Sequence, residues 1–217
     1  MAHRNTGGRS ASSASHTSSP NDRASSHGEN GALTLCVFCG SSPGTDPAYS
    51  AAARQLGKLI GEGGHRLVFG GGAVGLMGEV AREARDAGAE VIGILPAFLR
   101  HLEPPLKSAE ELIITPDLQQ RKARMLAMSD AFIHLPGGLG TMDEYFEVVT
   151  TAQLSVHRKP IVLIDVKQYF MPLKALIDHI VEQGFAKPEV AALHTFVATP
   201  QEAMQAVSAR RASVRAE

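Results

Sequence analysis

Short apolar runs alternate with helical patterns along most of this chain, and this alternation restricts its fold more than any other feature. Runs of strand length occupy 33–38, 66–69, 90–95, 112–115, 131–135, 161–165 and 195–198. Helical patterns occupy 48–62, 76–87, 118–128, 142–154, 173–183 and the chain from about 201. Strands joined through helices pair in parallel, with helices on both faces of the sheet. The sequence therefore predicts a doubly wound, Rossmann-like α/β fold in a single domain over residues 32–217.

The first 31 residues differ in composition from the rest and contain almost no large apolar side chain. Such a segment buries too little surface to offset the entropy of ordering, so we expect a disordered tail over residues 1–31. A transit peptide is the alternative, since the first acidic residue is Asp22, but no amphipathic helix is visible. The formal net charge of −1 argues against a nucleic-acid partner. No apolar run approaches the ~18 residues of a membrane span, so no membrane partner is expected.

The two cysteines, Cys36 and Cys39, have the C-x-x-C spacing of a redox pair or of half a zinc site. Residues three apart on a strand point to opposite faces, which favours two buried free thiols instead. Free thiols are typical of the reducing cytoplasm, where we expect the protein to reside. His101, His157 and His194 have no metal-ligand spacing, so we expect no metal and no cofactor.

Three glycine-rich loops follow predicted strands, at 40–44, 70–75 and 136–140. In doubly wound folds ligands bind beyond the carboxyl ends of the strands, so these loops are expected to share one polar cleft. The second loop, Gly70-x-Gly72-x-x-Gly75, matches the dinucleotide fingerprint. However, the fingerprint needs an acidic residue at the end of the following strand, which here ends in Pro96, and Glu90 lies at the start of that strand. A mononucleotide cleft or a tight turn is therefore favoured over classical NAD binding.

The third loop belongs to the segment PGGLGTMDE at 136–144, which lies between a predicted strand and a predicted helix. Glycine N–H groups and a helix N-terminus together favour a phosphate group. Asp143 and Glu144 add two carboxylates within the same turn. Thr141-x-x-Glu144 is also a capping box, which gives the alternative that both side chains only cap the helix. The two functions can coexist if Thr141 binds phosphate and Glu144 faces the cleft.

Three cations, Arg121, Lys122 and Arg124, lie near the start of the predicted helix 118–128. Positive charge there opposes the helix dipole, so an anionic ligand or nearby carboxylates would be needed to offset the cost. A merely solvated basic face is the alternative. The chain has no Gly-x-Ser-x-Gly elbow and no P-loop lysine pattern, which argues against a serine hydrolase and a P-loop NTPase.

Several of these segments together resemble the LOG (Lonely Guy) family. They are QRKARM at 120–125, PGGLGTMDE at 136–144, FCGSSPG at 38–44, GGGAVGLMGEVA at 70–81 and AQLSVHRKPIVL at 152–163. The family consists of cytokinin riboside 5′-monophosphate phosphoribohydrolases, many once described as possible lysine decarboxylases. The resemblance implies a homodimeric N-glycosidase that releases a free cytokinin base and ribose 5-phosphate from a small-molecule nucleotide.

The resemblance also implies residue roles. Arg121 and Glu144 match the catalytic positions of the family. The phosphate would be bound by Gly137, Gly138, Gly140 and Thr141. Further substrate-binding positions are Glu103, Lys122, Gly138, Leu139, Gly140, Thr141, Met142, Asp143 and Thr150.

Two other functions remain open at this point. One is a broader nucleosidase that accepts plain AMP, because the chain has Met142-Asp143 where the family often has Leu-Glu, and a changed base pocket would alter substrate preference. The other is a non-enzymatic nucleotide or molybdenum-cofactor carrier of the same fold. The joint presence of Arg121 and Glu144 favours an enzyme.

Overall fold

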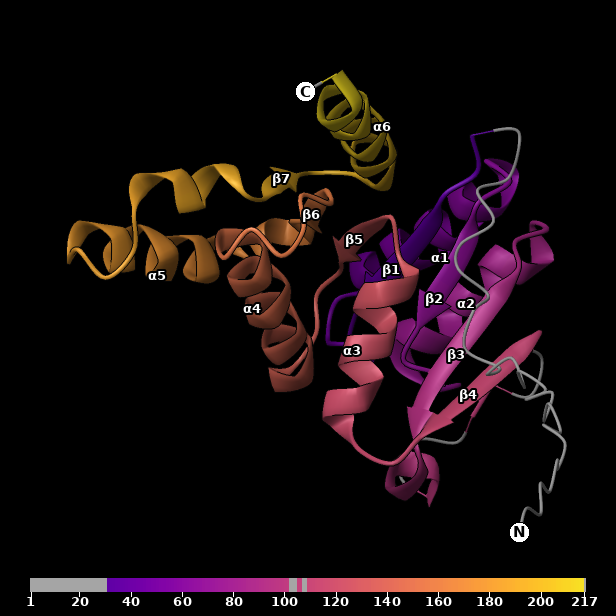
Figure 1. Cartoon of the computed structure of the whole chain (residues 1–217). Coiled ribbons are helices and arrows are strands. Elements are labelled where there is room, and N and C mark those ends of the chain that lie inside the picture. The colour runs from indigo at the N-terminus through magenta and orange to yellow at the C-terminus, as the bar shows by residue number, and fades with distance from the viewer. Residues whose placement is uncertain (1–30, 102–104, 107–108, 217) are drawn as a thin grey trace, which may run out of the picture.

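A single sheet of seven parallel strands organises the chain (Figure 1). The computed structural model describes residues 31–101, 105–106 and 109–216. The strand order is β4-β3-β2-β1-β5-β6-β7, and every neighbouring pair is parallel. The strands are β1 Thr34–Phe38, β2 Arg66–Phe69, β3 Val91–Pro96, β4 Glu111–Thr115, β5 Ala131–His134, β6 Ile161–Ile164 and β7 Thr195–Val197. The predicted α/β, doubly wound class is confirmed.

Helices cover both faces of this sheet. One apolar core joins the sheet to α1, α2 and α6, and a second joins the opposite face to α3, α4 and α5 (Figure 1). The bounds are α1 Pro47–Glu62, α2 Gly75–Asp86, α3 Leu118–Met128, α4 Leu139–Gln153, α5 Met171–Glu182 and α6 Pro200–Ala216. Three short 3-10 segments, Ala97–His101, Val166–Gln168 and Pro188–Ala192, complete the described elements.

Alternation along β1 shows how the sequence divides between the two cores. Leu35 and Val37 point into the core on the side of α1, and Cys36 and Phe38 point into the other. Cys39 belongs with the first pair, so the two cysteines lie on opposite faces and both are buried free thiols, as predicted. Burial raises the pKa of both thiols, which favours the protonated form.

Local signals set the ends of the predicted helices. Asp46 caps α1 by accepting a hydrogen bond from the Ala48 N–H at 2.8 Å, and Pro47 occupies the first helical position. Gly88, with φ of 96°, follows α2 and turns the chain toward β3. Among the described residues, no helix has the length and apolar character needed to cross a membrane.

The strand order reverses direction between β1 and β5, and this switch point brings the glycine loops together. The Gly40 N–H donates to the Pro136 carbonyl at 3.1 Å, which joins the loops after β1 and β5. Gly75, with φ of 59°, lies so close to the Ser41 backbone that a Cβ there would stand 2.3 Å from the Ser41 carbonyl carbon. The three loops therefore meet at one edge of the sheet, as expected from their positions in the sequence.

Candidate active site at the switch point

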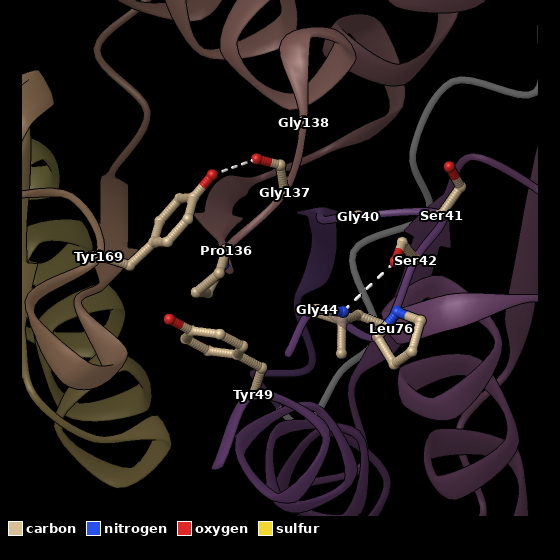
Figure 2. A pocket seen from close by; sticks show the side chains of 11 residues that line it. Gly40, Ser41, Ser42, Gly44, Tyr49, Leu76, Pro136, Gly137, Gly138 and Tyr169 are labelled. Carbon is tan, nitrogen blue, oxygen red and sulfur yellow. Dashed lines mark hydrogen bonds between the residues drawn. The ribbon is translucent and has the colours of Figure 1, made fainter. Parts of the chain in front are cut away.

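A cavity of about 200 Å³ lies between the loops after β1 and β5 (Figure 2). Two tyrosines also line it: Tyr49 from α1, beside Gly44, and Tyr169 from the turn between β6 and α5, beside Gly137 (Figure 2). The remaining lining consists of the two loops and one α2 side chain, namely Gly40, Ser41, Ser42, Pro43, Gly44, Leu76, Pro136, Gly137 and Gly138. Two of the three glycine loops thus share this cavity, whereas the loop 70–75, Arg121 and Glu144 are not part of its lining. The two tyrosines were not predicted from the sequence.

The loop after β5 enters α4 through glycine. Gly138 is the N-cap, in extended backbone conformation, and makes no side-chain capping bond. The first N–H groups of any α-helix have no acceptor within the helix, so those of Leu139, Gly140 and Thr141 are available to a ligand. At Gly137 a Cβ would stand 2.1 Å from the Thr141 Oγ1, so a side chain at 137 would displace the threonine. This geometry is that of an anion site at a helix N-terminus.

The capping-box alternative, and with it the predicted helix start at Met142, is wrong. The helix begins at Leu139, which places Thr141 inside its first turn instead of at the cap. Glu144 does not fold back onto the Thr141 backbone in a capping bond; its carboxylate faces α3 and accepts a hydrogen bond from Arg121. The N-cap is Gly138, so the helix starts earlier in the sequence than the Thr-x-x-Glu pattern predicted.

The predicted catalytic residues Arg121 and Glu144 form a buried ion pair. Arg121 Nη2 lies 3.0 Å from Glu144 Oε1, and the two residues are only 7% and 8% exposed. The guanidinium packs against Gly70, where a Cβ would stand 2.3 Å from Nη2. The Nε–H of Arg121 is buried and has no hydrogen-bond acceptor in the part of the chain that the structure describes. The side chain therefore retains one N–H donor without an acceptor among the described residues.

A second set of charges lies beside this pair. Lys122 Nζ lies 2.8 Å from Asp143 Oδ2 and 2.6 Å from Glu147 Oε2. Burial alone would lower the pKa of Lys122, but hydrogen bonds and charge from the two carboxylates outweigh it and raise the pKa. Carboxylates of α4 thus compensate the charges of Arg121 and Lys122 at the start of α3. The third cation, Arg124, is exposed. Lys122, which we expected to bind substrate, joins the two helices in this structure.

The remaining predicted site residues divide into three groups. Leu139, Gly140, Met142 and Asp143 lie on the first turns of α4 next to the loop. Thr150 is exposed and lies nearly two turns beyond Glu144 along α4, so one chain does not bring it to the ion pair. Glu103 lies outside the described residues. No group of three or more potential metal-ligating side chains occurs in the parts of the chain that the structure describes.

The fold and the site together define a Rossmann-like α/β protein in which glycine loops and a buried arginine–glutamate pair share one sheet edge. Residues 77–207 match a family model described as possible lysine decarboxylase. The chain belongs to this family, which is the LOG family to which the relatives described below also belong.

Tyr49 and Tyr169 were missed because a single tyrosine in a helix or turn has no diagnostic spacing.

Two plant relatives illustrate the likeness in sequence. The cytokinin riboside 5′-monophosphate phosphoribohydrolase LOG7 of Arabidopsis thaliana is 46% identical over 154 residues, which cover 71% of each chain. The probable cytokinin riboside 5′-monophosphate phosphoribohydrolase LOGL2 of Oryza sativa subsp. japonica is 43% identical over 171 residues, which cover 79% of this chain and 70% of the relative.

Solved structures agree with the fold. The molybdenum cofactor binding protein of Rippkaea orientalis superposes with a TM-score of 0.65 at 23% identity, covering 82% of this chain and 96% of that one. A Moco carrier protein of Chlamydomonas reinhardtii gives a TM-score of 0.64 at 22% identity, covering 84% and 99%. At these identities the likeness concerns the fold alone.

Proposed function

We propose that this protein hydrolyses the N-glycosidic bond of cytokinin riboside 5′-monophosphates, such as N6-isopentenyladenosine monophosphate. Water adds to the anomeric carbon, the base leaves with a proton, and ribose 5-phosphate remains. The observation that carries the proposal is the buried Arg121–Glu144 pair beside the glycine-capped start of α4. Relatives that are more than 40% identical bear the name of this activity.

The two side chains suit different parts of this reaction. Breaking a ribosyl bond builds positive charge on the sugar, and the carboxylate of Glu144 would stabilise that charge or activate water. Arg121 pairs with this carboxylate at 3.0 Å, and its Nε–H, which has no acceptor among the described residues, would donate to the nucleotide. The start of α4 would hold the 5′-phosphate, so that binding energy remote from the bond positions the reacting atoms.

The lysines of the described site do not suit decarboxylation through a Schiff base. That chemistry needs an amine whose pKa is lowered, so that it is uncharged and nucleophilic. The pKa of Lys122 is raised by its two carboxylate partners. Burial lowers the pKa of Lys159, but this residue immediately precedes Pro160 and β6, at the sheet edge opposite the glycine loops. The family description as a possible lysine decarboxylase is therefore not the function that we propose here.

We propose a small-molecule nucleotide as substrate, a cytoplasmic location and a homodimer with active sites close to the subunit interface. The buried free thiols support the location. The side chain of Leu139, at the mouth of the glycine loop, is 89% exposed, and a second subunit would cover such a group. Sedimentation velocity at micromolar concentration tests the dimer, and a single monomeric boundary would contradict it.

The test of the function is chromatographic analysis of products from three substrates: N6-isopentenyladenosine monophosphate, AMP and the unphosphorylated riboside. We expect free isopentenyladenine from the monophosphate and little base from the riboside. Efficient release of adenine from AMP would indicate the broader nucleosidase. If the purified protein releases no base from any of the three, the hydrolase proposal fails and a carrier function is favoured.

A further inference from the structure

The turn between β6 and α5 reaches across the cavity and contacts the glycine loop. This turn contains the 3-10 segment Val166–Gln168, and Tyr169 follows it. The Tyr169 hydroxyl donates a hydrogen bond to the Gly137 carbonyl (Figure 2). The bond therefore joins a side chain from one loop to the backbone of the loop that precedes α4.

Several contacts hold this tyrosine in place. Lys167 and Gln168, with φ of 56° and 60°, adopt the left-handed conformation, which costs free energy for residues other than glycine. Asp165 Oδ1 accepts a hydrogen bond from the Phe170 N–H at 2.6 Å and closes the turn. The Tyr169 ring packs edge-on against Tyr49 at 5.9 Å and against Phe170 at 5.1 Å. A strained turn fixed by surrounding contacts is typical of functional sites.

The bonded carbonyl determines where the next N–H group points. The Gly137 carbonyl and the Gly138 N–H belong to the same planar trans peptide, so the two groups point in opposite directions. Two consecutive glycines leave this peptide otherwise free to rotate. The Tyr169 hydroxyl thus opposes a rotation that would reorient the Gly138 N–H and the entry into α4.

We propose that Tyr169 is a positioning residue for phosphate binding: its hydroxyl fixes the Gly137–Gly138 peptide and so preorganises the N–H groups at the start of α4. The role rests on the proposed function in one respect, namely that the anion bound there is the 5′-phosphate of a nucleotide. Loss of the hydroxyl then weakens phosphate binding, while the Arg121–Glu144 pair stays in place.

The variants Tyr169→Phe and Tyr145→Phe test this role. Each loses one hydroxyl that has a hydrogen bond, but the Tyr145 hydroxyl lies in the core, 3.3 Å from His194 Nδ1. For N6-isopentenyladenosine monophosphate, we expect Tyr169→Phe to raise KM about three- to tenfold, the factor that one hydrogen bond supplies, with a smaller change in kcat. Calorimetry with ribose 5-phosphate should show a similar loss of affinity. Tyr145→Phe should leave KM and this affinity unchanged.

A second measurement needs neither substrate nor activity. Hydrogen exchange followed by mass spectrometry, without ligand, should show faster exchange in peptides covering residues 136–142 for Tyr169→Phe only. Faster exchange and weaker ribose 5-phosphate binding would support the positioning role even if the wild-type protein releases no base. Wild-type exchange, or wild-type affinity for ribose 5-phosphate in Tyr169→Phe, would overturn it. If the wild-type protein fails to bind ribose 5-phosphate, the phosphate site and the role assigned to Tyr169 both fail.

Discussion

At the scale of single residues, the site depends on a charge pair that water barely reaches. Removing one partner of a buried pair leaves the other charge uncompensated, which is more costly than losing a surface ion pair. The ion pair therefore also fixes the position of each side chain relative to the other. Because Arg121 lies on α3 and Glu144 lies on α4, the packing of these two helices determines the distance between the two charged groups.

Glu144→Gln tests the carboxylate at this scale. The amide keeps the shape but loses the charge, so we expect kcat to fall at least about 100-fold. Glu147→Gln is the matched control, because Glu147 lies on the same helix and pairs with Lys122 instead. This control should retain activity within about threefold, since partly exposed pairs contribute little. Circular dichroism and thermal unfolding check that both variants fold, and wild-type turnover by Glu144→Gln would contradict the assignment.

At the scale of elements, the turn before α5 carries backbone strain that glycine would relieve. A left-handed residue with a side chain costs roughly 1–2 kcal/mol, and the extra chain entropy of glycine offsets about half of that gain. Gln168→Gly should therefore raise the free energy of unfolding by about 0.5–1 kcal/mol in urea titrations. Gln205→Gly, in the exposed interior of α6, should instead lower it by about 1 kcal/mol. A loss of stability in Gln168→Gly would show that the side chain makes a compensating contact.

The helices and strands also show how much of the fold and of the site could be predicted from the sequence. Strand bounds were predicted closely because apolar runs such as 66–69 mark buried parallel strands directly. The start of α4 was placed three residues too late, because the Thr-x-x-Glu pattern is local and the contact that occupies Glu144 comes from a distant helix. Tyr169 could not be found, because its turn adopts left-handed conformations without the glycine that usually signals them.

At the scale of the whole molecule, buried histidines link global stability to pH. Burial, with a smaller effect from His194, lowers the pKa of His134 from 6.5 to about 3. At this position the unfolded chain thus binds more protons than the folded one between these values, so the contribution of His134 to stability falls as pH drops below about 6.5 and is constant above it. Burial also lowers the pKa of His157 and His194, so they act in the same direction.

His134→Phe should remove part of this dependence. The free energy of unfolding of the wild-type protein should fall by up to about 1.4 kcal/mol per pH unit for each such proton. A phenylalanine keeps an aromatic ring beside Phe38 and Tyr145 and cannot titrate. Urea denaturation at several values between about pH 7.5 and about pH 4.5 should give a shallower slope for the variant. Parallel curves would mean that His134 does not contribute.

In this parallel sheet, the edge formed by the carboxyl ends of the strands lies one strand length away from the edge formed by their amino ends. All three glycine loops lie at one edge, while the turns that lead into the strands lie at the other, roughly 13–20 Å away at about 3.3 Å per residue. At Gly64, in the turn between α1 and β2, an added Cβ would meet nothing within 4 Å. That turn is therefore a place where a tag, a fluorophore-bearing insertion or new chain termini could be engineered while the edge that carries the glycine loops stays intact.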